Sequence, residues 1–366
     1  MMKNIKNMNE NKMSNKSKLV LNIVSLIVFA VLITLLDKRI IGDSYVRRVL
    51  NTSAVYAIVA ISMNLINGFT GLFSLGQAGF MALGAYVVAI FTVPVGLRPS
   101  IFYVIKQNPV LAQIELPFFV ALILGGLLAA FVAILIGVPV LRLKSDYLAI
   151  ATLGFSEIIR IVITNIQTIT NGALGINRIP EMPSMWIFFC ILILSVIFIK
   201  LLINSSYGRA FKAIREDDIA AEAMGINLFR HKVLSFAIGA FFAGIGGGLY
   251  ASLLGSVVPN SFNIPMTYNF LLIIVLGGMG SISGTIISSF VVTSGLELLR
   301  FFDDKLTLGG VVIPIFRPGF RMVIFSALLM ILVLFFRNGL LGQKELSWDM
   351  IREKFLRKKS GKRGAA

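Results

Sequence analysis

Residues 117–141 have the sequence PFFVALILGGLLAAFVAILIGVPVL, an apolar run that contains no charged side chain. A helix needs roughly 20 apolar residues to cross the hydrocarbon core of a bilayer. The run is therefore long enough to cross a membrane as one helix. Segments of the same kind recur along the chain, so this stretch decides the class of fold to be expected.

The composition of the whole chain agrees with that expectation. Of its 366 residues, 57% are hydrophobic and 14% are charged, and the mean hydropathy is +0.88. A soluble domain is about 45–50% apolar and about 25% charged. The composition therefore predicts a polytopic membrane protein. The one cysteine, Cys190, excludes an internal disulfide framework, and the one histidine, His231, leaves no histidine cluster, so no metal site is expected.

The apolar segments predict an all-α fold with about ten transmembrane helices, within a range of about eight to ten. The sequence GGMGSISG, residues 277–284, breaks the last long apolar region into a short span and a longer one. The predicted spans are residues 19–36, 49–66, 73–93, 117–141, 147–166, 185–203, 233–256, 268–278, 282–299 and 321–336.

The net charge of +17 suggests a nucleic-acid partner at first, but the placement of the charge argues against one. Basic residues crowd residues 1–18, 200–232 and 337–363, beside apolar spans, as topology signals do. With both termini in the cytoplasm, most of the 34 lysines and arginines lie on the cytoplasmic side. We therefore expect a bilayer, and no nucleic acid, as the partner of this chain.

Three regions follow from that orientation. Residues 1–18 are expected to form a basic, disordered cytoplasmic arm, and residues 343–366 a basic cytoplasmic tail. Residues 19–342 form the transmembrane domain, which includes the cytoplasmic loop 204–232.

The loop contains the sequence GRAFKAIREDDIAAEAMGI, residues 208–226, which is dense in charge between two apolar spans. Residues 209–216 are rich in helix formers, and Asp217 and Asp218 can cap and begin a second short helix. Gly225 stands where a glycine that follows a helix belongs. The loop therefore predicts two short helices outside the bilayer, a compact element that can transmit force. The alternative is a solvated connection held by its own ion pairs, which contribute little.

The loop resembles the cytoplasmic element of ABC-importer permeases, whose hallmark is an EAA-type motif followed by a glycine. More closely, the chain resembles the branched-chain amino-acid permeases, in the form typical of the second of their two permease subtypes. The blocks that carry the resemblance are NLINGFTGLFSLGQAGFMALGAY (64–86), LRLKSDYLAIATLGFSEIIRI (141–161) with TNGALGI (170–176), GRAFKAIREDDIAAEAMGIN (208–227), LSFAIGAFFAGIGGGLYA (234–251) and VLGGMGSISGTIIS (275–288).

The resemblance implies a permease domain that works by alternating access in the plasma (inner) membrane. It implies a second homologous permease subunit, two ATP-binding subunits that hold ATP and Mg, and an extracellular or periplasmic substrate-binding protein. It also implies import of leucine, isoleucine and valine. The only Gly-Lys pair of this chain, Gly361-Lys362, lacks the flanking residues of a phosphate-binding loop, so no cofactor is expected in the chain itself. No catalytic residues are expected either.

By the same resemblance, loop 204–232 contains the coupling helix that seats in a groove of the ATPase subunit. The residues expected to couple the two subunits are Gly208, Arg209, Arg215, Glu216, Asp217, Ala220, Ala221, Glu222 and Gly225.

Polar and glycine-rich positions inside spans suggest the translocation pathway, because polar groups are costly in lipid and irregular backbone at depth lines cavities. Glu157 and Arg160 lie three residues apart on one helical face, so they are expected to pair. The alternative for the glycine-rich segments is close helix packing, and for the charged pair it is neutralisation between helices. The candidate pathway residues are Asn64, Gly68, Gly71, Ser74, Gly76, Gln77, Glu157, Arg160, Gly277 and Gly278.

Small residues also recur every four positions, at Ala240, Gly244 and Gly248, and this stripe predicts a packing seam within the subunit or against a partner.

Three other functions remain to be compared. Permeases for urea or short amides have similar sequences, and no residue excludes that cargo. An ion-coupled secondary transporter would not need loop 204–232. A membrane enzyme would need a polar catalytic cluster, which one histidine at a membrane boundary does not supply.

Overall fold

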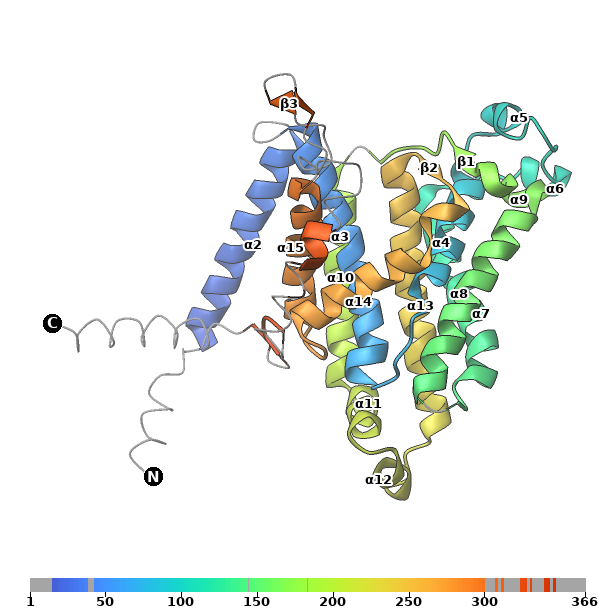
Figure 1. Ribbon diagram of the computed structural model, residues 1–366. Helices are drawn as coiled ribbons and strands as arrows, with labels where there is room; N and C mark the ends of the chain where they lie inside the picture. Colours follow the sequence, from blue (N-terminus) through green and yellow to red (C-terminus); the bar gives the residue numbers. More distant parts are fainter. Residues whose placement is uncertain are drawn as a thin grey trace, which may run out of the picture.

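The computed structural model describes residues 15–38, 43–143, 145–182 and 184–299, with 307–308, 311–312, 323–327, 330, 339–342 and 345–346. This part of the chain is almost entirely helical, with the long helices side by side in one bundle (Figure 1). The short helices α5 and α6 lie at one end of the bundle, and α11 and α12 lie at the other. The two ends are therefore built from different connections, and one of them carries loop 204–232.

The helices are α2 (Asn15–Asp37), α3 (Ser44–Asn64), α4 (Gln77–Thr92), α5 (Arg98–Ile101), α6 (Pro109–Ala112), α7 (Phe118–Val140), α8 (Ser145–Asn165), α9 (Gln167–Thr170), α10 (Met185–Asn204), α11 (Ser206–Glu216), α12 (Asp218–Ala223), α13 (Leu228–Leu254), α14 (Ile264–Gly277) and α15 (Ile282–Leu298). A π-helix, Leu65–Phe69, continues α3, and 3-10 turns cover Val95–Leu97, Gly172–Leu174 and Pro259–Ser261. The strands are two antiparallel pairs of two residues each: β1 (Ile176–Asn177) with β2 (Ser256–Val257), and β3 (Thr307–Leu308) with β4 (Val311–Val312).

Five of the described helices are long and apolar enough to cross a membrane: Ser44–Phe69, Phe118–Val140, Tyr147–Asn165, Met185–Asn204 and Leu228–Leu254. A sixth is added if Gln77–Thr92 and Val95–Ile101, which meet at a bend of 96°, form one broken span. The prediction of a polytopic, helical membrane protein is thus confirmed.

The predicted span 73–93 is wrong at its start, because the chain from residue 71 to residue 76 is irregular and α4 begins only at Gln77. We call residues 70–76 the first break. Hydropathy does not detect it, since a glycine-rich coil of apolar residues is as apolar as a helix. The predicted break between α14 and α15 is confirmed at residues 278–281, which we call the second break.

Some predicted regions fall largely or wholly outside the described residues. These are residues 1–14 of the arm, most of the span 321–336, and the tail after residue 346. The remainder of the predicted arm, from Asn15, already belongs to α2.

Helix α13 lies in the middle of the bundle and packs on α3, α4 and α7. A Cβ atom on Gly84 would collide with the carbonyl group of Gly244, and a Cβ on Gly244 would lie 2.8 Å from the Cβ of Ala129. Close backbone approach of this kind is what small residues permit in helix packing. The predicted small-residue stripe is therefore a seam within this subunit.

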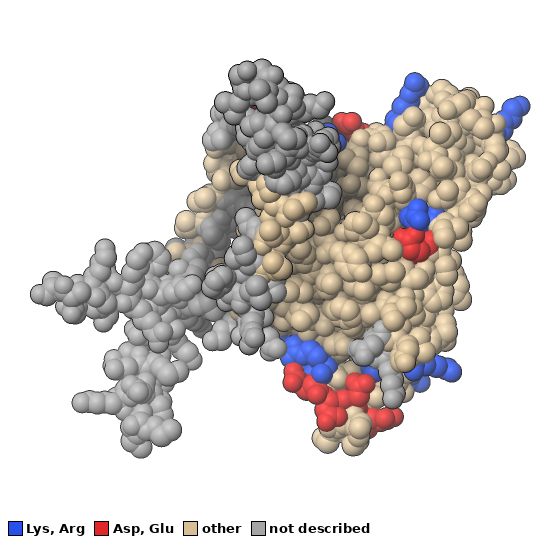
Figure 2. Space-filling view, viewed as in Figure 1, with Lys and Arg blue, Asp and Glu red and all other residues tan. Residues whose placement is uncertain are grey.

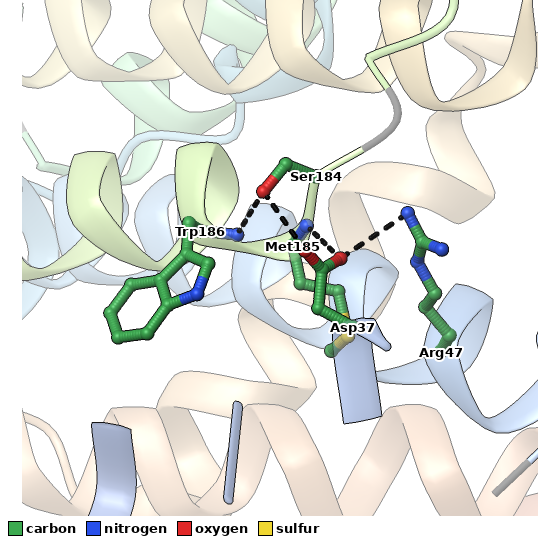
Figure 3. Close-up of polar contacts among 5 residues, drawn as sticks. All are labelled: Asp37, Arg47, Ser184, Met185 and Trp186. Atoms are coloured by element: carbon green, nitrogen blue, oxygen red, sulfur yellow. Dashed lines mark hydrogen bonds and ion pairs between the residues drawn. The ribbon is translucent and has the colours of Figure 1, made fainter. Parts of the chain in front are cut away.

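One carboxylate joins three helices at the end of the bundle opposite α12 (Figure 3). Asp37, the last residue of α2, accepts hydrogen bonds from the backbone N–H of Met185 (2.9 Å) and the hydroxyl of Ser184 (3.2 Å). The Arg47 guanidinium of α3 lies 3.4 Å from the same carboxylate. Ser184 in turn accepts from the N–H of Trp186, which caps α10. These contacts hold α2 against α3 and α10.

Candidate functional site

Loop 204–232 folds as its sequence predicts. The Asp217 carboxylate accepts hydrogen bonds from the N–H groups of Ile219 (2.9 Å) and Ala220 (3.0 Å), so it caps α12. Gly225 follows the end of α12 with φ of +84°, a conformation that glycine adopts without steric cost. The expected cap and the expected terminating glycine are both confirmed.

The outward face of the loop carries acidic side chains and, among them, two exposed apolar ones. Ile219 is 82% exposed and Met224 is 83% exposed. Figure 2 shows acidic side chains gathered at this end of the molecule, with basic side chains beside them. One ion pair, Lys232 with Asp218 at 2.7 Å, ties α12 to α13. Single exposed apolar residues are common, but two at the tip of one short helix offer an anchor to a partner. The exposed residues of the predicted coupling set are Arg209, Glu216, Asp217, Ala220, Glu222 and Gly225.

The inward face of the loop is packed against the bundle. Phe211 and Ile214 are buried, and Phe211 is in the core cluster. Ala221 is buried as well, and a Cβ atom on Gly208 would collide with the Ile203 carbonyl. Gly208 and Ala221 therefore pack within this chain and are not part of a surface for another subunit.

Arg215 also points inward, unlike its neighbour Glu216. The exposed fraction of its side chain is 22%, against 71% for Glu216. Its Nη1 donates to the carbonyl oxygen of Gly68 at 3.0 Å, and its Nε donates to Glu216 Oε1 at 3.1 Å. Gly68 belongs to the π-helix that ends α3, where the last carbonyl groups lack partners within the helix. A cation at that position satisfies one of them and complements the helix dipole.

Asn64 connects the end of α3 to the second break. Its Nδ2 donates to the carbonyl of Ser281 (3.0 Å) and to Thr285 Oγ1 (2.8 Å), and its Oδ1 accepts from the N–H of Gly280 (2.9 Å). The backbone of Gly68 packs directly against Gly280, since a Cβ on Gly68 would clash with the Gly280 nitrogen. Two segments far apart in the sequence therefore meet at one place.

The backbone of the first break forms no helix or strand, and hydrogen bonds from side chains hold it in place. Asn67 bonds both backbone groups of Ser74, its Oδ1 accepting from the N–H and its Nδ2 donating to the carbonyl, each at 3.1 Å. The N–H of Leu75 donates to Thr152 Oγ1 of α8 at 2.9 Å. Gln77, the first residue of α4, is fully buried, and its side-chain amide has no hydrogen-bond partner among the described residues.

The second break is closed by a returning segment near the C-terminus. The N–H groups of Leu340 and Leu341 donate to the carbonyls of Leu276 (2.7 Å) and Gly277 (3.4 Å). Gly277 packs on Gly284 across the break. Two described residues of the predicted tail lie here too, because the Glu345 carboxylate accepts from the N–H groups of Ile282 (2.6 Å) and Ser283 (3.0 Å) and Leu346 follows it.

Of the predicted pathway residues, the structure brings Asn64, Gly68 and Gly71 together beside Arg215. Ser74, Gly76 and Gln77 lie further along the first break, toward α8. Contact of any of them with a solute stays a prediction. Sequence reasoning missed Gly280 and Ser281, although both stand in the quoted block at 275–288, and it did not foresee that Arg215 faces the breaks.

Of the other four pathway candidates, Gly277 and Gly278 lie at the second break, and Glu157 and Arg160 are in the middle of α8. Arg160 Nε donates to Glu157 Oε2 at 2.8 Å, so the predicted pairing is confirmed. Their side chains are 24% and 29% exposed, and they lie beside the face of α8 on which Ser156 and Ile159 pack against α4. Figure 2 shows an acidic and a basic side chain side by side within the otherwise uncharged face over α8. Such a pair is costly in lipid and marks protein or water contact.

Several known proteins are similar in sequence to this chain. Residues 45–334 match the family described as the permease component of branched-chain amino acid transport systems. The high-affinity branched-chain amino acid transport system permease protein LivM of Escherichia coli is 35% identical over 302 residues, which cover 72% of this chain and 67% of LivM. LivH of Salmonella typhimurium, a permease protein of the same kind of system, is 22% identical over 314 residues (80% and 93%). The ribose import permease protein RbsC of Haemophilus influenzae is 21% identical over 343 residues (88% and 94%). No solved structure matches the chain.

Proposed function

The chain belongs to the family of branched-chain amino acid transport permeases, and from that premise we propose that it is the membrane subunit of an ATP-driven importer whose energy comes from a separate ATPase. The observation that carries the proposal is the two-helix loop α11–α12. Its outer face is exposed, and on its inner face Arg215 lies against Gly71 of the first break and Gly280 of the second. Such a loop gives a soluble ATPase subunit a surface to bind and a connection to the membrane-spanning helices.

The ATPase subunit would bind the tip of the loop, formed by Ile219, Met224 and the acidic residues around them. Exposed apolar side chains surrounded by charge provide an anchor with a polar rim, as in protein interfaces. ATP and Mg would be bound by two such subunits, and this chain would carry out no covalent chemistry.

The proposed orientation places both termini and loop 204–232 in the cytoplasm of a cell with this chain in its plasma (inner) membrane. The connection 141–145 and loop 204–232 lie at the same end of the bundle, as that orientation requires (Figure 1). Each carries basic residues, which favour the cytoplasmic side.

The complete importer would hold a second, homologous permease subunit and an extracellular or periplasmic binding protein. The similarity of this chain to both LivM and LivH supports a pair of related permeases. The binding protein would deliver the amino acid at the end of the bundle that carries α5 and α6.

We propose leucine, isoleucine and valine as cargo, and the Glu157–Arg160 pair as a contact for their charged ends. An amino acid carries one ammonium and one carboxylate, so a carboxylate beside a guanidinium is complementary to it. The pair is partly exposed within an apolar span, where a solute or a second subunit can reach it. Urea or a short amide is the alternative cargo, and a neutral solute would not need these charges.

Reconstitution in liposomes tests the source of energy. The chain alone is expected to accumulate no labelled leucine, whereas the complex with its partner permease, ATPase and binding protein accumulates it when ATP is supplied. Accumulation by the chain alone under a proton or sodium gradient would indicate an ion-coupled transporter and would contradict the proposal.

Charge-neutral variants test the cargo. Glu157→Gln and Arg160→Gln are expected to raise the KM for leucine uptake by roughly tenfold, the size expected for losing one charged partner in a partly buried pair. Lys200→Gln, an exposed lysine near the end of α10 and away from the end proposed for the binding protein, is the matched control and should leave KM unchanged. Uptake of labelled urea by the wild type, with no uptake of leucine, would replace the proposed cargo.

A further inference from the structure

We propose that Arg215 is the positioning residue that carries a displacement of loop 204–232 to both helix breaks at once. The inference rests on the proposed function, because it assumes that an ATPase moves the loop. The inference goes further than the proposed function because it assigns the transmission of motion to one side chain. From the sequence, the same side chain was expected to contact the ATPase.

The side chain of Arg215 fills the space beside the first break. An ideal Cβ on Gly71 would lie 2.8 Å from Arg215 Cγ and 3.0 Å from Arg215 Cα, so only a glycine leaves room for this arginine. Gly71 also has φ of +75°. Together with the hydrogen bond from Nη1 to the Gly68 carbonyl, this contact places Arg215 against the chain on both sides of Thr70, the residue that follows the π-helix.

The same guanidinium reaches the second break. Its Nη1 lies 3.1 Å from the position that a Cβ on Gly280 would take. Gly280 is in turn bound to Asn64, so the second break cannot move away from Arg215 without disturbing the end of α3. One side chain from the loop therefore contacts the three chain segments that meet at this point.

A cavity lies on either side of the contact that Arg215 makes with the breaks. A cavity of about 410 Å³ is lined by Arg215, Lys212, Gly280 and Ile282 among others. A second, of about 470 Å³, is lined by Arg215, Thr70 and residues of the connection after α7. Arg215 crosses between these cavities and contacts both breaks, so it offers the loop a direct route to them.

The segments that Arg215 contacts are suited to move. The first break is irregular and depends on side-chain hydrogen bonds, whereas α4, α14 and α15 begin or end at the two breaks as rigid helices. Hinges of this kind, a few residues at the ends of elements, allow rigid helices to change their tilt. A shift of Arg215 would therefore tilt several spans together.

The alternative is that Arg215 only caps the π-helix and stabilises the fold. The two roles differ in what survives when the guanidinium is removed. A cap would lower stability and the yield of assembled complex. A transmitting residue would leave assembly and ATP hydrolysis in place and lower the number of solute molecules moved per ATP.

The test uses the full complex with Arg215→Met, which keeps the length of the side chain and removes its donors and charge. We expect the ATPase to copurify and hydrolyse ATP as in the wild type, while the ratio of leucine imported to ATP hydrolysed falls about tenfold, within the range for residues along a coupling route. Arg215→Lys should be intermediate, because it keeps the charge without the fork of donors. Arg230→Met, at an exposed position in the first turn of α13, is the matched control and should keep the wild-type ratio.

A second measurement follows the breaks without transport. Phe73, in the first break, is 39% exposed, so Phe73→Cys in a Cys190→Ser background offers a thiol to a reagent. ATP should change the labelling rate of this thiol in the complex. The change should disappear with Arg215→Met and persist with Arg230→Met. An unchanged import ratio, or an unchanged response of labelling to ATP in Arg215→Met, overturns the inference.

Different results would refute the proposed function and the role of Arg215. A wild-type complex that shows no ATP-dependent import would refute the proposed function itself. A wild-type complex that imports leucine, together with an Arg215→Met complex that imports equally well per ATP, would refute only the role of Arg215.

Discussion

The two faces of loop 204–232 differ in solvent exposure and in what they contact, although neighbouring residues form them. The outward face carries Ile219, Met224 and acidic side chains in contact with solvent, whereas the inward face buries Phe211 and directs Arg215 to the helix breaks. The first is open to solvent and the second packs within this chain. Under the proposed function, changes to the outer face should therefore affect binding of the ATPase, and changes to the inner face should affect the fold or, at Arg215, the transmission of motion.

The largest effect on function is expected on the outer face, from Gly225→Asp. A residue with a side chain is strained at φ of +84°, and the new carboxylate adds to an acidic tip. We expect copurification of the ATPase and leucine uptake to fall by about tenfold or more, as for the loss of an interface hot spot, with membrane insertion intact.

Gly96→Asp, at an open position in the connection after α4 and at the opposite end of the bundle, is the matched control for that variant and should retain copurification of the ATPase. A Gly225→Asp chain that still binds the ATPase would remove the outer face from the proposed interface.

On the inner face, Phe211→Ala should destabilise the protein by about 3–5 kcal/mol, the usual range for removing a fully buried phenylalanine. Thermal unfolding of the purified chain in detergent measures the loss. Tyr207→Ala is the comparison, because Tyr207 is exposed on the same helix and contacts the same His231 ring that Phe211 contacts. Equal losses in the two variants would show that the inner face is not specially packed.

Asn64→Leu tests the hydrogen bonds that join the end of α3 to the second break, next to Arg215. The change removes three hydrogen bonds and leaves the buried N–H of Gly280 without its bond to Asn64 Oδ1, so we expect a loss of about 1–3 kcal/mol. Asn51→Leu in the same helix is the control: its Oδ1 is buried with no partner among the described residues, so its loss should cost far less. A thermal shift of the same size in both variants would contradict the assignment of Asn64 as a tie between the breaks.

The smallest effect is expected from Lys232→Met. The Lys232–Asp218 pair is close, at 2.7 Å, but Asp218 is half exposed, and pairs of this kind contribute roughly 0–1 kcal/mol. The melting temperature should therefore change little, and less in high salt than in low salt. A shift comparable with that of Phe211→Ala would mean that the ion pair, and not the buried aromatic residue, holds the loop to α13.

The features that could be predicted from the sequence depend on a few neighbouring residues. Apolar length predicted a helical membrane protein, Asp217 and Gly225 predicted the bounds of α12, and the glycines at 277–284 predicted the second break. Capping and chain reversal are decided within a turn or two of helix, and burial in lipid within a run of about 20 consecutive residues, so the residues that decide them stand together in the sequence.

Other features were decided only by the tertiary structure. Arg215 and Gly68 are 147 residues apart, and Asn64 and Gly280 are 216 apart, yet each pair shares a hydrogen bond. No local pattern distinguishes an inward arginine from the outward glutamate next to it. The start of α4 and the partly exposed position of the Glu157–Arg160 pair were decided in the same way. Each depends on which helices pack side by side, and packing compares surfaces from distant parts of the chain.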